Sequence, residues 1–325
     1  MKHIETKDLS VAEAFSFLLA GVSPRPIALV ATVSEKGNRN LAPFSFFNTF
    51  GANPPTVAFS PSARIRDGSR KDTYYNLKQV GECTIQAVTY DMVEQVNLAS
   101  TWYEPGVDEF VKSGLTPIAS DLVRPPRVKE SPFQMECVLD RVIPLGDGKG
   151  SGNLMICRVL KFHIAEDIFA AGGKSIDPQR LDLVGRNGGD FYTRAQGSAL
   201  FEVEKPLVTK GIGYDQLPPH IKASHVFTAN NLAKLGNTEK IPTKKEVMEF
   251  IKEIERIKPG KESDLLGAFE RYRRVGEYRH MLAVAVCLKK ENHPLAGQKI
   301  ETAAKEALEK NDRDFAWKAA LYVEF

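Results

Sequence analysis

The sequence predicts a mainly β protein: a closed antiparallel sheet in the first two-thirds of the chain, with a mostly helical domain behind it. Short β-branched runs are separated by Gly and Pro turns with few helical stretches between them, which favours a closed antiparallel sheet over a doubly wound one. Apolar residues then recur at the helical period through the last third. Since 325 residues suit about two domains, we place the boundary at 206, between residues 1–205 and 206–325.

The predicted strands follow one another along the first domain. "PIALVATVS" is a nearly continuous apolar run, and two shorter runs come after turn residues; the three lie at residues 26–34, 56–60 and 83–88. Two longer runs, 133–145 and 153–164, flank the glycine-rich loop 146–152 and are typical of a long hairpin with a flexible tip. Helical periodicity interrupts the strands only at residues 90–100 and 108–115.

The second domain begins its helical pattern with a capping box, in which Glu246 follows Thr243 by three residues. Apolar residues follow at one helical face until Pro259-Gly260 stops the helix; they are Val247, Phe250, Ile251, Ile254 and Ile257. Further on, "AFERYRRVGEYRHMLAVA" resembles a tetratricopeptide helix pair, through Ala268, Tyr272, Gly276 and Tyr278. No convincing second copy of this segment follows, so the sequence does not establish a repeat.

Composition excludes several classes of protein. The 44 basic and 41 acidic residues leave a net charge of +3, too small for the global field of a nucleic-acid binder. No run of 18 apolar residues exists and the N-terminus lacks a signal-peptide pattern, so we expect a cytoplasmic protein without a membrane segment. The four cysteines form no CxxC pair, which favours reduced thiols over disulfides or a metal site.

Several catalytic motifs fail on inspection, and we identify no catalytic residue. "AGGKS" ends like a P-loop, but the first glycine of that motif would fall at Ile168. "GDGKGSG" does not open a helix after a strand, so it is no dinucleotide fingerprint. His163 lies in a strand-like run, and we interpret it as a packed or surface residue.

The segment "SPSARIRDGSRKDT", residues 60–73, concentrates basic and hydroxyl side chains between two apolar runs. A phosphate dianion binds to this mixture of arginine, lysine, hydroxyl and free backbone amide groups. Taken alone, the segment fits a solvated turn as well as an anion-binding loop. The surrounding motifs favour the anion-binding loop.

Those motifs stand in order along the first domain: "PRPIALVATVS", "NRNLAPFSFFN", "NPPTVAFS", "KDT", "ESPFQMEC" and "GRNGGDFY". Together they resemble the flavin reductase-like, FMN-binding split-barrel family, the flavoredoxin type in particular, over about residues 20–200. The resemblance implies an antiparallel, Greek-key-like split β-barrel, bound FMN, NAD(P)H as electron donor, and a homodimer with each FMN near the subunit interface. It does not extend to the helical domain.

The resemblance also implies site residues. Thr32, Ser45, Phe46 and Asn48 lie in the segments expected beside the isoalloxazine ring. Phosphate contacts fall on Ser60, on one loop arginine, for which we choose Arg66, and on Lys71, Asp72 and Thr73, with Asp72 more suited to orienting the loop. Arg186 corresponds to an arginine near the flavin, although a surface turn explains it nearly as well. Relatives often have histidine where this chain has Asn153, which cannot become cationic near neutral pH.

The function expected from the resemblance is that of an NAD(P)H-dependent flavin reductase, an oxidoreductase that passes hydride to flavin or another acceptor. In the alternative, the protein carries electrons on FMN without reducing it and docks a protein partner through the C-terminal helices. A third idea is a helical interaction protein whose barrel holds no flavin. The electron acceptor, the choice between NADH and NADPH, and the role of residues 206–325 stay open.

Overall fold

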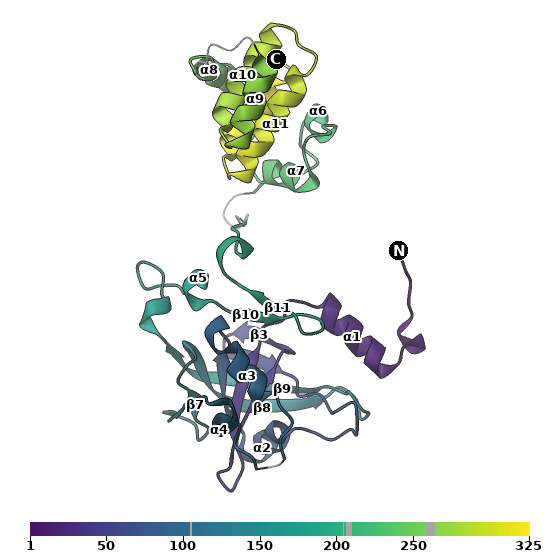
Figure 1. The fold of residues 1–325 in the computed structure, drawn as a ribbon, viewed down its shortest axis with the longest axis vertical. Helices are drawn as coiled ribbons and strands as arrows, with labels where there is room; N and C mark the ends of the chain where they lie inside the picture. Colours follow the sequence, from purple (N-terminus) through teal and green to yellow (C-terminus); the bar gives the residue numbers. More distant parts are fainter. Residues whose placement is uncertain (105, 204, 206–209, 258–263) are drawn as a thin grey trace. The chain divides into compact units, whose positions relative to one another are not determined.

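The structure is a computed structural model that describes residues 1–104, 106–203, 205, 210–257 and 264–325. The chain divides into two compact units, Met1–Glu202 and Val203–Phe325, which are described separately (Figure 1). Residue 206, where we placed the domain boundary, lies outside the described residues, and so does the predicted helix stop at Pro259-Gly260.

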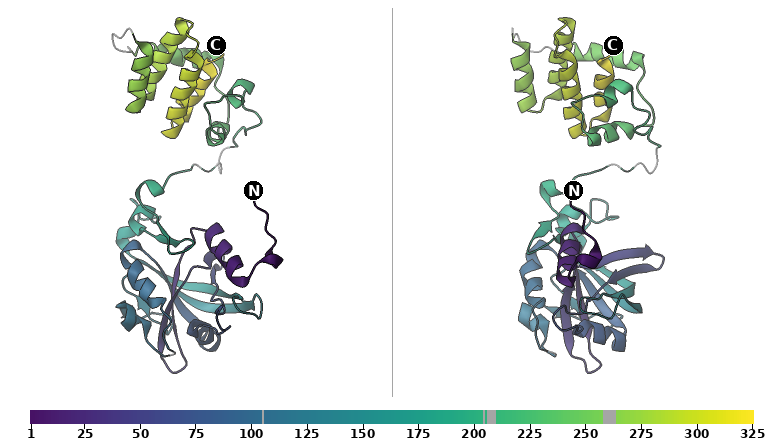
Figure 2. Two further views of the ribbon diagram at one scale, coloured as in Figure 1. Left: turned by 45° about the vertical axis from the view of Figure 1, so that its right-hand side comes forward. Right: turned by 90° about the vertical axis from the view of Figure 1, so that its right-hand side faces the viewer.

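The first unit is built on a seven-stranded antiparallel sheet in the order β2-β1-β5-β8-β9-β4-β3. The strands are β1 Ala28–Val33, β2 Arg39–Phe44, β3 Phe47–Ala52, β4 Pro55–Phe59, β5 Glu82–Ala87, β8 Phe133–Pro144 and β9 Asn153–Ile164. The sheet is strongly twisted and curls on itself (Figure 2). The predicted antiparallel sheet and the long β8–β9 hairpin are confirmed.

Both faces of β1 are buried, which explains why its sequence is continuously apolar. Successive side chains of a strand point to opposite faces. Ala28 and Val30 therefore join the barrel core with residues such as Phe59, while Leu29 and Ala31 face the helices outside the sheet. Each fully buried leucine or valine contributes about 1.5–3 kcal/mol, so this strand anchors the unit.

Short elements surround the sheet. The helices are α1 Val11–Gly21, α2 Asp72–Val80, α3 Val93–Ala99, α4 Glu109–Ser113 and α5 Pro178–Leu181. The short strands are β6 Pro117–Ile118, β7 Arg127–Val128, β10 Val184–Arg186 and β11 Tyr192–Arg194, and the 3-10 turns are η1 Thr6–Asp8, η2 Tyr90–Met92, η3 Glu166–Ile168 and η4 Gly197–Ala199. The helices α1 and α2 lie outside the stretches predicted as helical, residues 90–100 and 108–115. A capping box of Ser10 and Glu13 begins α1, and Gly81 in a left-handed conformation ends α2.

The second unit is helical throughout its regular structure, as predicted. Its helices are α6 Pro219–Lys222, α7 Ala229–Gly236, α8 Lys244–Ile254, α9 Leu265–Arg274, α10 Tyr278–Lys290, α11 Ala296–Glu309 and α12 Arg313–Tyr322. The capping box of Thr243 and Glu246 begins α8, as expected. Buried side chains continue without a break from Met281 to Val286, so α10 is the central helix of this unit.

The turn between α9 and α10 recurs between α11 and α12. Gly276 and Asn311, 35 positions apart, both adopt left-handed backbone angles, with φ of 70° and 60°. The next residue donates its amide to a carbonyl five residues back in each case, Glu277 to Tyr272 and Asp312 to Ala307, at 3.0 and 2.9 Å. The same turn also follows α10, where Asn292 has a φ of 57° and the His293 amide donates to the Leu288 carbonyl at 2.9 Å, so the turn ends three helices alike and does not by itself mark a second copy of the helix pair.

The four cysteines are free thiols. Cys83, Cys137 and Cys157 lie buried on β5, β8 and β9, whereas Cys287 on α10 is partly accessible. Hydrogen bonding to Cys137 and Cys157, followed by burial, raises the pKa of the Cys83 thiol well above its usual value. Among the helices of the described residues, none is long and apolar enough to cross a membrane.

Candidate functional site

A cavity of about 260 Å³, which we call the loop cavity, opens beside the β2–β3 corner. Its lining comes from α1, from that corner, from the segment after β4 and from the hairpin tip: Phe15, Leu19, Pro43, Phe44, Ser45, Phe46, Ser60, Ser62, Ala63, Arg64, Ile65, Lys71 and Gly150. Four of the predicted site residues meet there, namely Ser45, Phe46, Ser60 and Lys71.

Ser60 joins three strands at the floor of this cavity. Its amide donates to the Phe46 carbonyl at 2.8 Å, and its hydroxyl accepts from the Asn153 amide at 3.0 Å. A Cβ at Gly152 would lie 3.0 Å from the Ser60 hydroxyl oxygen, so a residue with a side chain would crowd the site. Asn153 donates its side-chain amide to the Pro61 carbonyl, while its Oδ1 is buried without a partner among the described residues.

Lys71 is a partly buried cation without a counter-charge in contact. Its Nζ lies 4.9 Å from the centre of the Phe44 ring and makes no hydrogen bond or ion pair with any described residue. Burial, and next the charge of Arg64, lower the pKa of Lys71, whereas the carboxylate of Glu109 acts in the opposite direction. A bound anion would relieve both unfavourable effects.

The two loop arginines differ in their surroundings. Arg64 lines the loop cavity and donates from Nη1 to the Ser69 hydroxyl at 2.9 Å. Arg66 lies outside the lining, where it pairs with Asp67 at 3.1 Å and keeps 70% of its side chain exposed. Both guanidinium groups stack on Trp102, at 4.3 and 3.7 Å from the ring centre. Hydrogen bonds from Ser69, and next from Arg66, hold the pKa of Asp67 well below its usual range.

Thr32 and Thr73 are fully buried and do not line the loop cavity. Both hydroxyls donate to Oδ1 of Asn40, at 3.1 and 2.8 Å. Asp72 is the first residue of α2 and is partly buried. Asn48 is exposed on β3 and lines a separate apolar cavity of about 580 Å³.

Arg186 lies on β10 and lines a third cavity, of about 220 Å³, which it shares with Ser45. Its backbone forms an antiparallel bridge with Arg25, with hydrogen bonds of 2.8 and 2.9 Å. Arg25 donates from Nε to the Ser45 hydroxyl at 3.3 Å and from Nη1 to the Val22 carbonyl just beyond α1. The pKa of Arg25 is lowered mainly by burial and to a smaller extent by the charge of Arg186. Ser45 thus connects the two cavities.

Some residues of this region were absent from the predicted site set. Phe15 and Leu19 come from α1, whose capping box is the sequence signal that could have revealed the helix. Arg64 was recognised as one of the basic residues of the loop but was not chosen over Arg66. The two arginines differ because Arg66 pairs with the adjacent Asp67, whereas Arg64 donates to Ser69 and lines the cavity. The aspartate next to Arg66 is the sequence signal that could have favoured Arg64.

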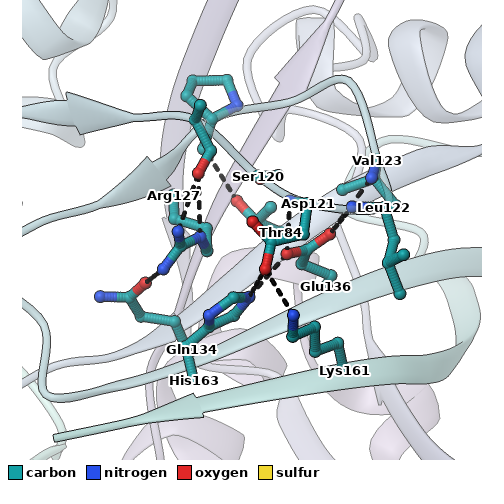
Figure 3. Close-up of polar contacts among 12 residues, drawn as sticks. Thr84, Ser120, Asp121, Leu122, Val123, Arg127, Gln134, Glu136, Lys161 and His163 are labelled. Atoms are coloured by element: carbon teal, nitrogen blue, oxygen red, sulfur yellow. Dashed lines mark hydrogen bonds and ion pairs between the residues drawn. The ribbon is translucent and has the colours of Figure 1, made fainter.

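His163 belongs to a separate polar cluster on β8 and β9 (Figure 3). Its Nε2 lies 2.6 Å from Oε1 of Glu136, which is fully buried and accepts backbone amides from Asp121, Leu122 and Val123 at 2.9, 2.6 and 3.1 Å. Lys161 pairs with Asp121 at 2.5 Å. Asp121, Glu136 and His163 are close enough to hold a metal ion. However, their polar atoms are already engaged, and the cluster ties the loop before β7 to the sheet.

A curled antiparallel sheet of seven strands, with short helices around it and a cavity at the corner of its early strands, is the architecture of a split β-barrel. The chain belongs to the flavin reductase-like family. Residues 20–178 match the model of the flavin reductase like domain. An uncharacterised protein of Halalkalibacterium halodurans is 37% identical over 205 residues, which cover 62% of this chain and 95% of that protein.

Solved structures agree with this assignment. Nitrilotriacetate monooxygenase component B from Bacillus cereus is 34% identical, with a TM-score of 0.58, over 62% of this chain and 98% of that one. A putative flavin reductase with a split barrel domain from Shewanella frigidimarina is 25% identical, with a TM-score of 0.54, over 63% of this chain and 100% of that one. The predicted split-barrel fold and family are therefore confirmed.

Proposed function

We propose that the first unit binds FMN at the loop cavity and serves as an NAD(P)H-dependent flavin reductase. Hydride would pass from the nicotinamide donor to flavin or another acceptor. The observation that carries the proposal is Lys71, a partly buried cation without a hydrogen bond or ion pair to any described residue, in a cavity that also contains Arg64.

The phosphate of FMN suits this end of the cavity. Lys71 and Arg64 supply positive charge, and Ser60 and Ser62 supply hydroxyl groups. Each charge-assisted hydrogen bond contributes about 1.5–3 kcal/mol, so two or three of them would supply about 3–9 kcal/mol of the free energy that holds the nucleotide. We assign the phosphate contact of the loop to Arg64 in place of Arg66, because Arg66 is paired with Asp67 outside the cavity lining.

The isoalloxazine ring suits the other end, near Ser45 and Phe46. Phe46 packs edge-on against Phe15 of α1, with ring centres 5.9 Å apart, so α1 supplies apolar cover that would exclude water. Arg25 and Arg186 lie on the far side of Ser45 and place two positive charges near that end. Positive charge there would stabilise a reduced, anionic flavin.

Bound FMN supplies the hydride and electron transfer chemistry itself. The residues of this chain then need only to hold the phosphate, orient the ring and limit water, and no catalytic base is required. This division of roles agrees with a cavity whose described lining residues include serines, cations and aromatic rings and no histidine or carboxylate.

We also propose that the protein works as a homodimer. On the edge strand β3, Phe50 is 67% exposed, and an apolar cavity that Phe47 and Asn48 line lies beside the strand. A second copy of the chain would cover these groups. The alternative function is that of an electron carrier, which holds FMN without reducing it from NAD(P)H. The helices of the second unit would then dock a protein partner.

The decisive experiment is to mix the purified protein, loaded with FMN, with NADH or NADPH under anaerobic conditions. We expect the visible flavin absorbance to bleach with at least one donor. Colour that persists until dithionite is added would contradict the reductase and support the carrier. A colourless protein that does not take up added FMN would contradict both.

A further inference from the structure

A buried polar network lies beneath the loop cavity and joins β1, β2, α2 and α4. Asn40 is its centre: Oδ1 accepts from the hydroxyls of Thr32 and Thr73, and Nδ2 donates to Oε1 of Glu109 at 3.1 Å. The backbone amide of Leu41 donates to Oε2 of Glu109 at 3.0 Å. Asn76 completes the network by donating from Nδ2 to the Thr32 hydroxyl at 3.1 Å.

The chemistry of the network permits one arrangement. Glu109 is 8% exposed, and as a carboxylate it only accepts hydrogen bonds, so the amide nitrogen of Asn40 must face it. The Asn40 oxygen is then left for the two threonine hydroxyls. Each of these hydrogen-bonding groups is used, and buried polar networks that are fully satisfied hold their members rigidly.

The network meets the cavity through α2. Thr73 lies in the first turn of α2, two residues after Lys71, the N-cap residue that lines the cavity. Asp108, which precedes Glu109, forms an ion pair with Arg39 beside Asn40, which fixes α4 to β2 as well. The position of Lys71 therefore depends on a network that does not itself line the cavity.

We propose that Asn40 and Glu109 are positioning residues for the phosphate end of the flavin site, holding the first turn of α2 and Lys71 in place before the nucleotide binds. This inference rests on the proposed function. It gives Thr73 a role through Asn40 instead of a contact with phosphate, and Thr32 a role through Asn40 instead of a place beside the ring. Removing either partner should weaken the hold on phosphate more than the hold on the ring.

The test exchanges the amide and the carboxylate without changing the size of either residue. Asn40→Asp sets two carboxylates against each other, and Glu109→Gln sets an amide against either the Asn40 amide or the Leu41 amide. In the double variant N40D/E109Q, the new amide at position 109 donates to the new carboxylate at position 40, and its oxygen accepts from Leu41, so every bond is restored. Binding of FMN and of riboflavin, which lacks the phosphate, is measured for each protein by fluorescence quenching.

We expect each single variant to lose about tenfold in FMN affinity and about twofold at most in riboflavin affinity, with the double variant returning to within about threefold of wild type. Gln134→Ala is the matched control, because Gln134 is another buried amide that donates to two backbone carbonyls, Val128 and Ser131. It should lower the melting temperature without changing the ratio of the two affinities.

Two outcomes overturn the positioning role: equal losses for FMN and riboflavin in the single variants, or a double variant that is no better than the singles. If Asn40→Asp does not fold, Glu109→Gln alone provides the answer. A larger loss of affinity for FMN than for riboflavin supports the positioning role, and equal losses overturn it. A wild-type protein that binds neither ligand points to an error in the flavin site itself, and the positioning role is then lost with it.

Discussion

At the scale of single residues, Lys71 is the group on which the proposed site depends most. The fold takes its ammonium partly out of water and places Arg64 nearby, and no described residue offers it a carboxylate in contact. An unpaired, partly buried charge lowers the stability of the folded protein until an anion binds to it. Arg66, only five positions away, is already neutralised by Asp67.

We therefore predict that Lys71→Met reduces FMN affinity by about ten- to a hundredfold, the loss of one charge-assisted contact of about 1.5–3 kcal/mol. Equilibrium titration with FMN measures the effect. Arg66→Ala is the matched control on the same loop and should retain affinity within about threefold. Equal losses in the two variants would place the phosphate elsewhere along the loop.

The residue types of this site could be predicted from the sequence, but their individual roles could not. Basic and hydroxyl residues concentrated after a strand indicate an anion-binding loop. Arg66 pairs with Asp67 outside the cavity, whereas Arg64 donates to Ser69 and lines it, and this choice of partners depends on how the loop folds. The burial of Thr32 and Thr73 depends on β1 pairing with β2, which brings Thr32 opposite Asn40.

At the scale of elements, local signals predicted the strands, the long hairpin and the capped helix α8. Several helices of the first unit were not predicted, among them α1 and α2, and α2 begins within the segment that was interpreted as a loop. The helix α1 has no buried residue, and its apolar sequence lacks the polar face of an amphipathic helix.

The tie between Glu136 and the loop before β7 gives a prediction at this scale. Burial alone would raise the pKa of Glu136, but the backbone amides and His163 outweigh it and hold the pKa below the usual value of 4.5. Stability from this carboxylate is therefore present above about pH 4.5 and lost as the pH falls further. Glu136→Gln should destabilise the unit by about 3 kcal/mol at neutral pH.

Thermal melting between pH 7 and pH 3 checks this expectation. The melting temperature of Glu136→Gln should start lower and fall less steeply with acid than that of the wild type. Asp121→Asn is the control, because it removes an exposed carboxylate that pairs with Lys161 and lies 4.0 Å from His163, and exposed pairs contribute little to stability. If the melting temperature of Glu136→Gln falls with acid as steeply as that of the wild type, the Glu136 carboxylate is not the group whose protonation destabilises the unit.

The edge strand β3 gives a second prediction for an element. If a second copy of the chain covers Phe50, Phe50→Asp should convert a dimer of about twice 36.1 kDa into a monomer, because the aspartate would place a charge in the interface. Light scattering measures the mass. Val111→Asp changes an equally exposed apolar residue on α4 and should leave the dimer intact. A wild-type monomer would contradict the dimer itself.

At the scale of the whole molecule, two compact units share one chain, and the family match at residues 20–178 lies within the first. The relative from Halalkalibacterium halodurans aligns over 95% of its own length with only 62% of this chain. A natural protein of about the first unit's length therefore exists without the remainder, which argues that the first unit folds by itself.

A chain ending at Glu202 should accordingly fold and bind FMN with an affinity within about threefold of that of the full chain. Circular dichroism checks folding, and flavin titration checks binding. A truncated protein that folds but no longer binds FMN would mean that the helical unit takes part in the site.

The placement of the four thiols has a practical consequence. Three of them lie within the packed sheet, and the fourth, on α10, is the one that a reagent can approach in the native protein. A maleimide dye should therefore attach at a single position in the helical unit. If the other unit holds its fluorescent flavin, energy transfer between the two chromophores becomes a ruler for the separation of the units, without any engineered cysteine.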